Sequence, residues 1–200
     1  GEKEIPNDIS QPVGQWAGAG AELFVLQGIA FEKLLCPNTA KKISALSETV
    51  RKAGMKFGVE FAPEMLDTSG EAYAKHPELT LKSSVREGER RLNLADLRAQ
   101  KYLVRILSTA LSGIKVSYVG WADEGSAREL PAGYWEGLYG VMEKITERFP
   151  SVLFEGRKKR KNLAVRCFLP GFEDLPAAML SGKWSAEEIS DENAALKKKE

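Results

Sequence analysis

Cysteine, histidine and long hydrophobic runs are scarce in this sequence. The two cysteines, Cys36 and Cys167, do not define a disulfide framework, so we expect a reducing, cytoplasmic location. The single histidine, His76, excludes a metal site built from several histidines and leaves only one base for a Ser-His-Asp triad. No apolar run approaches the ~20 residues of a membrane span, and the polar N-terminal segment predicts no signal peptide. We therefore expect a soluble chain without metal or cofactor.

An excess of charge of one sign is also missing. The net charge is +1, with 43% hydrophobic and 28% charged residues, which is ordinary for a globular protein. This balance gives no general attraction to nucleic acid or membranes. Neither GxGxxG nor GxxxxGK[ST] follows any predicted strand, which argues against the nucleotide-binding folds that use those loops. With 200 residues the chain is long enough for one core, and we treat 1–200 as a single domain.

Segments with strand-like and helix-like hydrophobic spacing alternate along the chain. Short apolar or alternating runs predict strands at 21–31, 55–61, 79–83, 90–95, 116–121, 151–156 and 162–169. Apolar residues at helical spacing predict helices at 39–53, 97–112 and 130–148, and Ser185 with Glu188 has the spacing of a capping box in the tail. Asn38 and Asp96 are the expected N-caps of the first two helices, and Gly54 is expected to end the first.

Strands that alternate with helices favour βαβ units and a mostly parallel sheet. The predicted fold is α/β, a TIM-type (β/α) barrel that is compact or partial. In such barrels the site lies at the C-terminal ends of the strands and in the loops that follow them. We therefore expect a small molecule or a sugar to bind at these ends.

Several of these strand regions carry long, collinear family matches. The runs AELFVL, AGMKFGVEFAPEM, AYAKHPELTL, VSYVGW and GLYGVMEKITERFPSVLFEG resemble the barrel domain of family 36 glycoside hydrolases, the bacterial α-galactosidases. The resemblance covers roughly residues 20–156. It implies a (β/α)₈-type fold and retaining hydrolysis of α-galactosides, which uses one carboxylate as nucleophile and one as acid/base.

The sequence departs from this family at nearly every chemical position. The resemblance places the family's nucleophile directly after Trp121 and a sugar-binding lysine directly before it, where this chain has Ala122 and Gly120. Gln27 stands where the family has the first of two aspartates, and Asn93 replaces another aspartate. The family's pocket loop after FPSVLFEG is replaced by RKKRKN. Conserving the scaffold while changing the pocket is expected of a pseudoenzyme or of a redesigned chain.

Three acids remain as candidate catalytic residues. Glu60 lies at a strand end beside small residues, where it is either a desolvated general base or a solvent-facing acid. Asp123 is one residue beyond the family's nucleophile position, so strand alternation turns it to the other side. Asp191 is the nearest match to the family's acid/base aspartate, but the capping box at Ser185 places it within the predicted tail helix. The candidate ligand-binding residues are Gln27, Glu64, Asn93 and Trp121.

Two of the candidate ligand-binding residues also have structural interpretations. Glu64 follows Pro63 and is expected to hold the next loop by accepting backbone hydrogen bonds. Trp121 is expected to pack between a strand and a helix instead of stacking on a sugar. A structure that gives the direction of each side chain distinguishes these interpretations.

Three functions are compatible with these residues. The first is an α-galactosidase-like barrel scaffold that lacks the parental hydrolase activity. The second is an enzyme with a repurposed pocket, in which Glu60 acts as general base on a small apolar substrate. The third is a non-catalytic scaffold or an anion-binding module that uses the basic run 157–161, although a solubilising loop also explains that run. Exposed sheet edges of a partial barrel would favour a homo-oligomer.

Overall fold

Four parallel strands form the main sheet of the computed structural model, which describes residues 10–84, 87–122 and 130–156. Their order across the sheet is β1 (Leu23–Leu26), β2 (Lys56–Phe61), β6 (Tyr118–Trp121) and β7 (Leu153–Gly156). Each strand is added beside the preceding strand of this sheet, so the order never reverses. This singly wound arrangement differs from a doubly wound sheet, in which the order reverses at a switch point.

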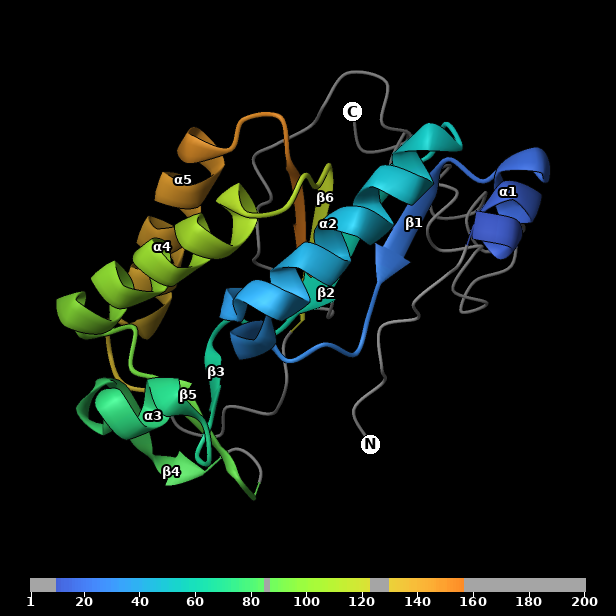
Figure 1. The fold of residues 1–200 in the computed structure, drawn as a ribbon. Helices are drawn as coiled ribbons and strands as arrows, with labels where there is room; N and C mark the ends of the chain where they lie inside the picture. The colour runs from blue at the N-terminus through green and yellow to red at the C-terminus, as the bar shows by residue number, and fades with distance from the viewer. Residues whose placement is uncertain (1–9, 85–86, 123–129, 157–200) are drawn as a thin grey trace, which may run out of the picture.

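Three long helices connect these strands. They are α2 (Pro37–Lys52), α4 (Leu97–Ser112) and α5 (Tyr134–Arg148). Connections between parallel strands are almost always right-handed, so crossovers that proceed in one direction place their helices on one face of the sheet. In Figure 1, α2 lies across β1 and β2, and α4 and α5 run side by side next to it.

Strand alternation divides the side chains of the sheet between two faces. Phe57, Val59 and Phe61 of β2 are buried in the same hydrophobic core as Val119 and Trp121 of β6. The helices contribute inward-facing residues to this core, including Ile43, Leu46, Val50, Leu103, Ile106, Leu107, Leu138 and Val141. The alternate positions of the strands therefore face the other side, which corresponds to the interior of a barrel.

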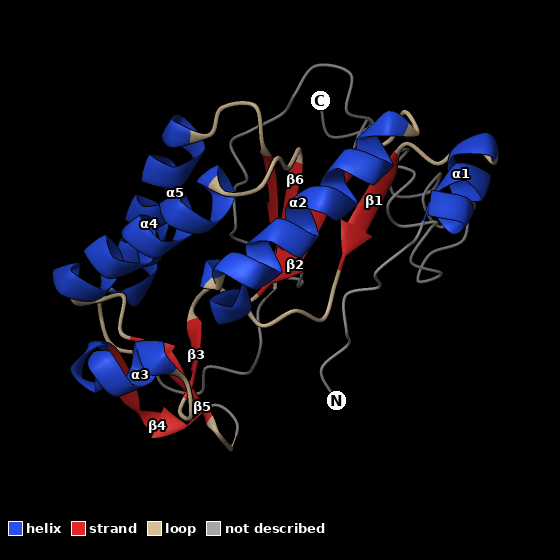
Figure 2. Ribbon diagram, viewed as in Figure 1, coloured by secondary structure: helices blue, strands red, loops and turns tan. Residues whose placement is uncertain are grey.

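A second, smaller sheet is antiparallel and has the order β3 (Met65–Asp67), β5 (Glu89–Leu92), β4 (Thr80–Ser84). It lies with α3 (Glu71–Lys75) and the 3₁₀ turn Pro77–Leu79 at one end of the molecule (Figure 2). The strands predicted at 79–83 and 90–95 exist, but their expected place in a mostly parallel sheet is wrong. A short connection that includes Gly88 joins them, whereas a parallel pair needs a crossover of a dozen or more residues.

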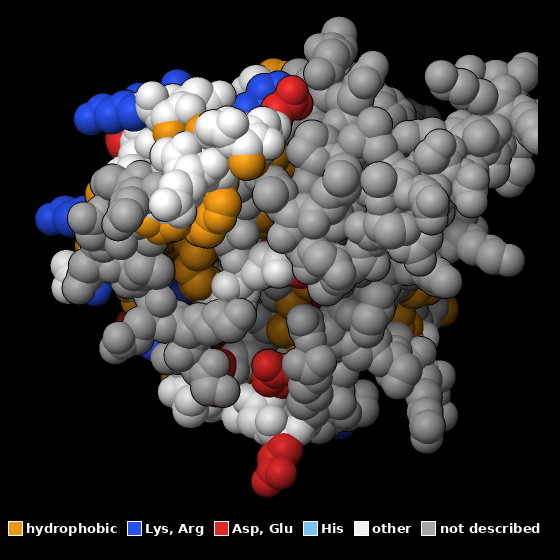
Figure 3. Space-filling view, turned by 90° about the vertical axis from the view of Figure 1, so that its right-hand side faces the viewer, with side chains coloured by type: hydrophobic (Ala, Val, Ile, Leu, Met, Phe, Trp, Pro, Cys, Tyr) orange, Lys and Arg blue, Asp and Glu red, His pale blue; other side chains and the backbone are white. Residues whose placement is uncertain are grey.

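The N-terminal part adds two short elements, α1 (Ser10–Gly18) and the 3₁₀ helix Phe31–Leu35. Trp16 of α1 stacks on Phe24 of β1, with 5.8 Å between the ring centroids, and remains 40% exposed. Figure 3 views the molecule from the side on which α1 lies in Figure 1, where hydrophobic side chains are visible between polar and charged ones. The homo-oligomer that exposed sheet edges would favour stays a prediction.

Helix boundaries follow the sequence signals closely, with two corrections. Helix α2 begins at Pro37 with Cys36 as its N-cap, so the expected cap at Asn38 is wrong; proline is favoured in the first helical turn. Gly54 follows the helix with φ of +88°, as expected of a glycine at this position. Helix α5 begins at Tyr134, four residues after the predicted start at 130. The predicted strand at 162–169 and the tail helix lie outside the described residues.

The N-cap of α4 provides a first test of local stability. Asp96 accepts a hydrogen bond from the backbone N–H of Arg98 at 2.8 Å. Replacing Asp96 with alanine is expected to lower the free energy of unfolding by about 1 kcal/mol, whereas asparagine retains most of the cap. Urea denaturation of the two variants and the parent chain measures this difference; equal stability of the alanine variant and the parent at pH 7 would contradict it.

The same contribution should depend on pH. Hydrogen bonds from the Arg98 guanidinium, and then from its backbone N–H, hold the pKa of Asp96 below its usual value. A carboxyl group with a lowered pKa in the folded state stabilises the fold above its unfolded-state pKa. The stabilisation is lost as the pH falls through the lower, folded-state pKa, so the deficit of the alanine variant should shrink in acid.

Candidate functional site

The C-terminal ends of the four parallel strands place polar residues in one row on the inner face of the sheet. Glu60 of β2 pairs in register with Gly120 of β6, and Gly120 pairs with Glu155 of β7. Gln27 follows β1, next to the pair of Leu26 with Val59. The row is therefore Gln27, Glu60, Gly120 and Glu155, with a glycine between the two carboxylates.

Hydrogen bonds hold both carboxylates of this row. The side-chain amide of Gln27 donates to Oε2 of Glu60 at 2.8 Å, and the hydroxyl of Tyr118 donates to Oε2 of Glu155. Gln27 comes from the β1 side, so this contact lies on the side of Glu60 away from Glu155. The inner face therefore presents carboxylate, amide and phenol groups together, which are groups that hydrogen-bond the hydroxyls of a polyol.

Two glycines make this packing of side chains feasible. A Cβ atom at Gly58 would lie 2.7 Å from Cδ1 of Tyr118, so the tyrosine ring rests directly on the backbone of β2. A Cβ atom at Gly120 would lie 3.1 Å from Cγ of Glu60 and 3.3 Å from the hydroxyl of Tyr118. The side chains of Glu60 and Tyr118 therefore meet over Gly120, in the position that the family resemblance assigns to a lysine.

Glu64 and Trp121 form a buried cluster with Tyr134 of α5. The carboxylate of Glu64, 5% exposed, accepts a hydrogen bond from the indole N–H of Trp121 at 2.9 Å and another from the hydroxyl of Tyr134. The expected loop-holding role of Glu64 therefore needs a correction, because these partners are side chains and not backbone groups. The expected packing of Trp121 in the core is confirmed. Ligand binding by Glu64 and Trp121 stays a prediction.

Asn93 lies away from this row. It follows β5 of the small antiparallel sheet, and its backbone N–H donates to the carbonyl of Leu79 at 2.8 Å. Its side-chain Oδ1 is buried and has no hydrogen-bond partner among the described residues. The structure therefore brings Gln27 and Glu60 together as neighbours, and it places Asn93 directly after a strand of the other sheet.

Two residues of this inner face, Tyr118 and Glu155, are not among the candidate site residues predicted from the sequence. Strand alternation provides the signal that finds them, because Tyr118 lies two residues before Gly120 on β6 and Glu155 lies at the matching level of β7. The catalytic candidates Asp123 and Asp191, and the basic run 157–161, lie outside the described residues. Their assignments stay predictions.

Known α-galactosidases are similar to this chain over its barrel segment. The Melibiase family model matches residues 31–161. The chain belongs to this family. Probable α-galactosidase G of Aspergillus terreus is 35% identical over an alignment of 125 residues that covers 58% of this chain and 17% of that protein. α-Galactosidase AgaA of Geobacillus stearothermophilus is 34% identical over an alignment of 131 residues that covers 56% of this chain and 18% of that protein. The resemblance to family 36 α-galactosidases is thereby confirmed.

Solved structures give the same result for the fold. The crystal structure of AgaA matches 74% of this chain and 25% of its own, with a TM-score of 0.58 and 25% identity. An α-galactosidase from Lactobacillus brevis matches 72% of this chain and 24% of its own, with a TM-score of 0.60 and 26% identity. The predicted α/β fold of TIM-barrel type is confirmed, and the four parallel strands correspond to a part of the barrel in these neighbours.

This chain spans less than a fifth of the length of the curated relatives named above. Across the described ranges 10–84, 87–122 and 130–156, every helix is too short or too polar to traverse a lipid bilayer. Within these same ranges, histidine, cysteine and acidic side chains do not gather in groups of three that could hold a metal ion.

Proposed function

We propose that this chain is an α-galactosidase-like barrel scaffold without retaining hydrolase activity of its own. The observation that carries the proposal is the composition of the inner row at β6. By the family resemblance, the nucleophile would stand at Ala122, and the residue that faces Glu60 from β6 is Gly120. Retaining hydrolysis needs two carboxyl groups about 5–5.5 Å apart. The two carboxylates of the row, Glu60 and Glu155, lie on the strands that flank β6, and neither stands at the nucleophile position, Ala122.

A sugar or another small molecule is the proposed ligand of the inner face. Two AgaA structures are complexes with raffinose and with stachyose, both of them sugars, which supports a ligand of this class at the corresponding strand ends. In this chain Gln27, Glu60, Tyr118 and Glu155 supply both donors and acceptors to that region. Binding would use these four side chains without bond cleavage.

The test combines an activity assay with a binding measurement. With an aryl α-galactoside, we expect no turnover above the uncatalysed rate, because the route through a covalent intermediate needs a nucleophile. With galactose, we expect NMR shifts at the amides of Gln27, Glu60 and Gly120, and at least tenfold weaker binding in Glu60→Gln. Turnover that is abolished by Asp123→Asn or Glu60→Gln would overturn the proposal.

One observation supports a second candidate, a pocket repurposed for proton abstraction. Glu60 is partly buried near the end of β2, and the small residue Ala122 directly follows the neighbouring strand β6. A partly buried carboxylate at a strand end is suited to act as a general base on a small apolar substrate. The test measures the rate of proton abstraction from a substrate with an activated C–H bond. Equal rates with the parent chain and with Glu60→Gln would exclude this candidate.

A further inference from the structure

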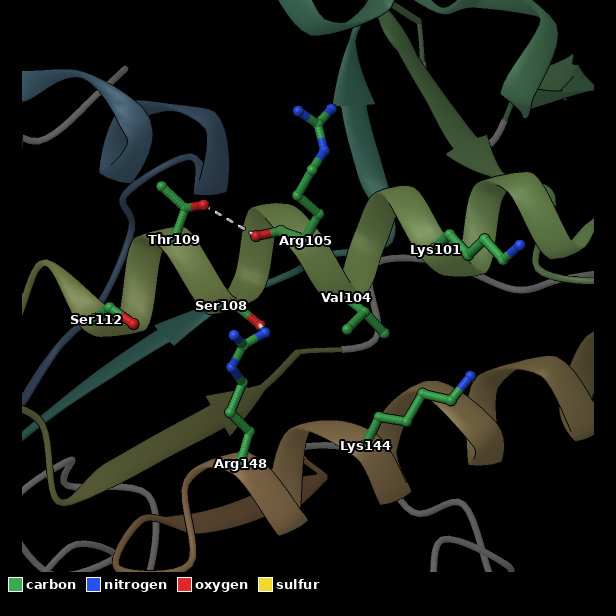
Figure 4. Close-up of a pocket in the computed structure, with 8 residues that line it drawn as sticks. All are labelled: Lys101, Val104, Arg105, Ser108, Thr109, Ser112, Lys144 and Arg148. Atoms are coloured by element: carbon green, nitrogen blue, oxygen red, sulfur yellow. Dashed lines mark hydrogen bonds between the residues drawn. The ribbon is translucent and has the colours of Figure 1, made fainter.

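A pocket of about 540 Å³ opens between α4 and α5, on the helix side of the molecule and away from the inner face of the sheet. In Figure 4, Lys144 and Arg148 extend from α5 toward α4, where Val104 and Ser108 face them. Arg105 and Thr109 form the far rim on α4. The lining consists of Lys101, Val104, Arg105, Ser108, Thr109, Ser112, Lys144 and Arg148.

The lining is strongly basic because of helical spacing. Lys101, Arg105 and Ser112 share one face of α4, and Lys144 and Arg148 are one turn apart on α5. None of the described residues that line the pocket carries a carboxylate. The nearest acids in the sequence of α5 are Glu143 and Glu147, and among the described residues neither forms an ion pair with Lys144 or Arg148.

The cations of the pocket differ from other basic residues of this chain in their partners. Elsewhere Lys75 pairs with Glu71 at 2.6 Å, and Arg98 pairs with Asp96 at 2.7 Å. Within the described part of the chain, the four cations that line the pocket form no ion pair with an acid. Lys101, Lys144 and Arg148 therefore contribute positive charge to one concave region, which attracts anions, whereas the Arg105 guanidinium points away from α5 (Figure 4).

Two of these cations are already positioned. A guanidinium nitrogen of Arg148 donates to the hydroxyl of Ser108 at 3.0 Å, across the gap between the helices, and Ser108 is 7% exposed. The guanidinium of Arg105 lies 5.3 Å from the centre of the Tyr102 ring. Side chains that are held before binding lose less conformational entropy when a ligand arrives.

We propose that this pocket binds a small anion that carries two adjacent phosphate groups. A guanidinium donates two parallel hydrogen bonds to phosphate, and an ammonium adds a compact positive charge. The lysines Lys101 and Lys144 would hold one phosphate, while Arg148 and the hydroxyls of Ser108 and Ser112 would hold the other. The aliphatic side chain of Val104 lies beside them. The volume falls within the 300–1,000 Å³ range of small-molecule pockets.

Titration calorimetry of the full chain with inorganic pyrophosphate at low ionic strength tests the proposal. We expect saturable binding of one pyrophosphate per chain that weakens at least tenfold in the double variant Lys144→Gln, Arg148→Gln. The matched control is Arg51→Gln, Lys52→Gln, which removes the same charge from exposed positions on α2 and should change the affinity less than twofold. Equal weakening in both double variants, or binding that does not saturate, would overturn the proposal.

Three further measurements distinguish this pocket from other anion-binding and sugar-binding sites of the chain, and distinguish a free diphosphate from an organic one. NMR shifts are expected at the amides of Ser108 and Lys144, with Glu60 unshifted, so the result is independent of the sugar experiment. Neutralising the basic run 157–161 should leave the affinity unchanged, and loss of binding there would contradict the proposal. If ADP binds more tightly than pyrophosphate, the ligand is an organic diphosphate; equal affinities identify the phosphates alone as the recognised part.

Discussion

Replacing Gly137 with alanine will lower the free energy of unfolding by about 3 kcal/mol, the upper end of the typical cost of overpacking a core. A Cβ atom at this position of α5 would lie 1.8 Å from the carbonyl oxygen of Leu94 and 2.8 Å from the side-chain nitrogen of Gln100. The carbonyl belongs to the backbone, so it cannot rotate away as a side chain would. Helix α5 must instead shift outward, which would disturb the buried side chains of Tyr134 and Leu138 on either side.

The same helix contains the matched control for this prediction. A Cβ atom at Gly140 would meet nothing within 4 Å. The substitution Gly140→Ala should therefore raise the free energy of unfolding by up to about 1 kcal/mol, the difference in helix propensity between the two residues. Urea denaturation of both variants measures the contrast. If both substitutions change the free energy of unfolding by the same amount and in the same direction, α5 does not lie this close to Leu94.

Replacing Glu64 with leucine will lower the free energy of unfolding by about 3 kcal/mol. The Glu64 carboxylate accepts hydrogen bonds from the Trp121 indole and the Tyr134 hydroxyl in the buried interior. Without it, these two donors lose their acceptor, and each buried unsatisfied group costs about 1–3 kcal/mol. The loss should appear in the denaturant midpoint with little change in the slope of the free energy against denaturant concentration.

A rescue experiment separates unsatisfied donors from simple loss of packing. The triple variant Glu64→Leu, Trp121→Phe, Tyr134→Phe removes the donors together with their acceptor, which is far less costly than removing the acceptor alone. It should regain part of the stability that the single variant lost, although a phenyl ring in place of the Trp121 indole leaves some space unfilled. If the triple variant loses as much stability as the three single variants lose in total, the hydrogen-bond explanation is contradicted.

The sequence was sufficient to predict the elements whose signals are local. Asp96 and the apolar stripe of α4 fix that helix, because its cap and its spacing lie within a few residues of one another. The strands β2 and β6 follow from short apolar runs, and the matched family segments assign them to a barrel. The antiparallel arrangement of β3, β4 and β5 is less accessible, because three to five residues carry too little periodicity to give the direction of pairing.

In the candidate site, too, local features can be predicted from the sequence and long-range contacts cannot. Alternation along β2 places Glu60 with Gly58 on one face, and this needs only the local period of two residues. The contact of Tyr118 with Glu155 joins residues 37 positions apart and depends on the register between β6 and β7. The partners of Glu64 are 57 and 70 positions away. Such contacts are determined by the assembled layers, so no short stretch of sequence contains them.

The order of the main sheet has a consequence for how the chain folds during synthesis. The sequence of strands in space, β1, β2, β6 and β7, is also their sequence in time as the chain leaves the ribosome. Each new strand of this sheet meets a neighbour that has already emerged, so no later strand has to insert between two strands that have already paired. The small sheet between β2 and β6 contains only contiguous pieces and can form during the same interval. Growth at one edge therefore permits vectorial assembly from the N-terminal side.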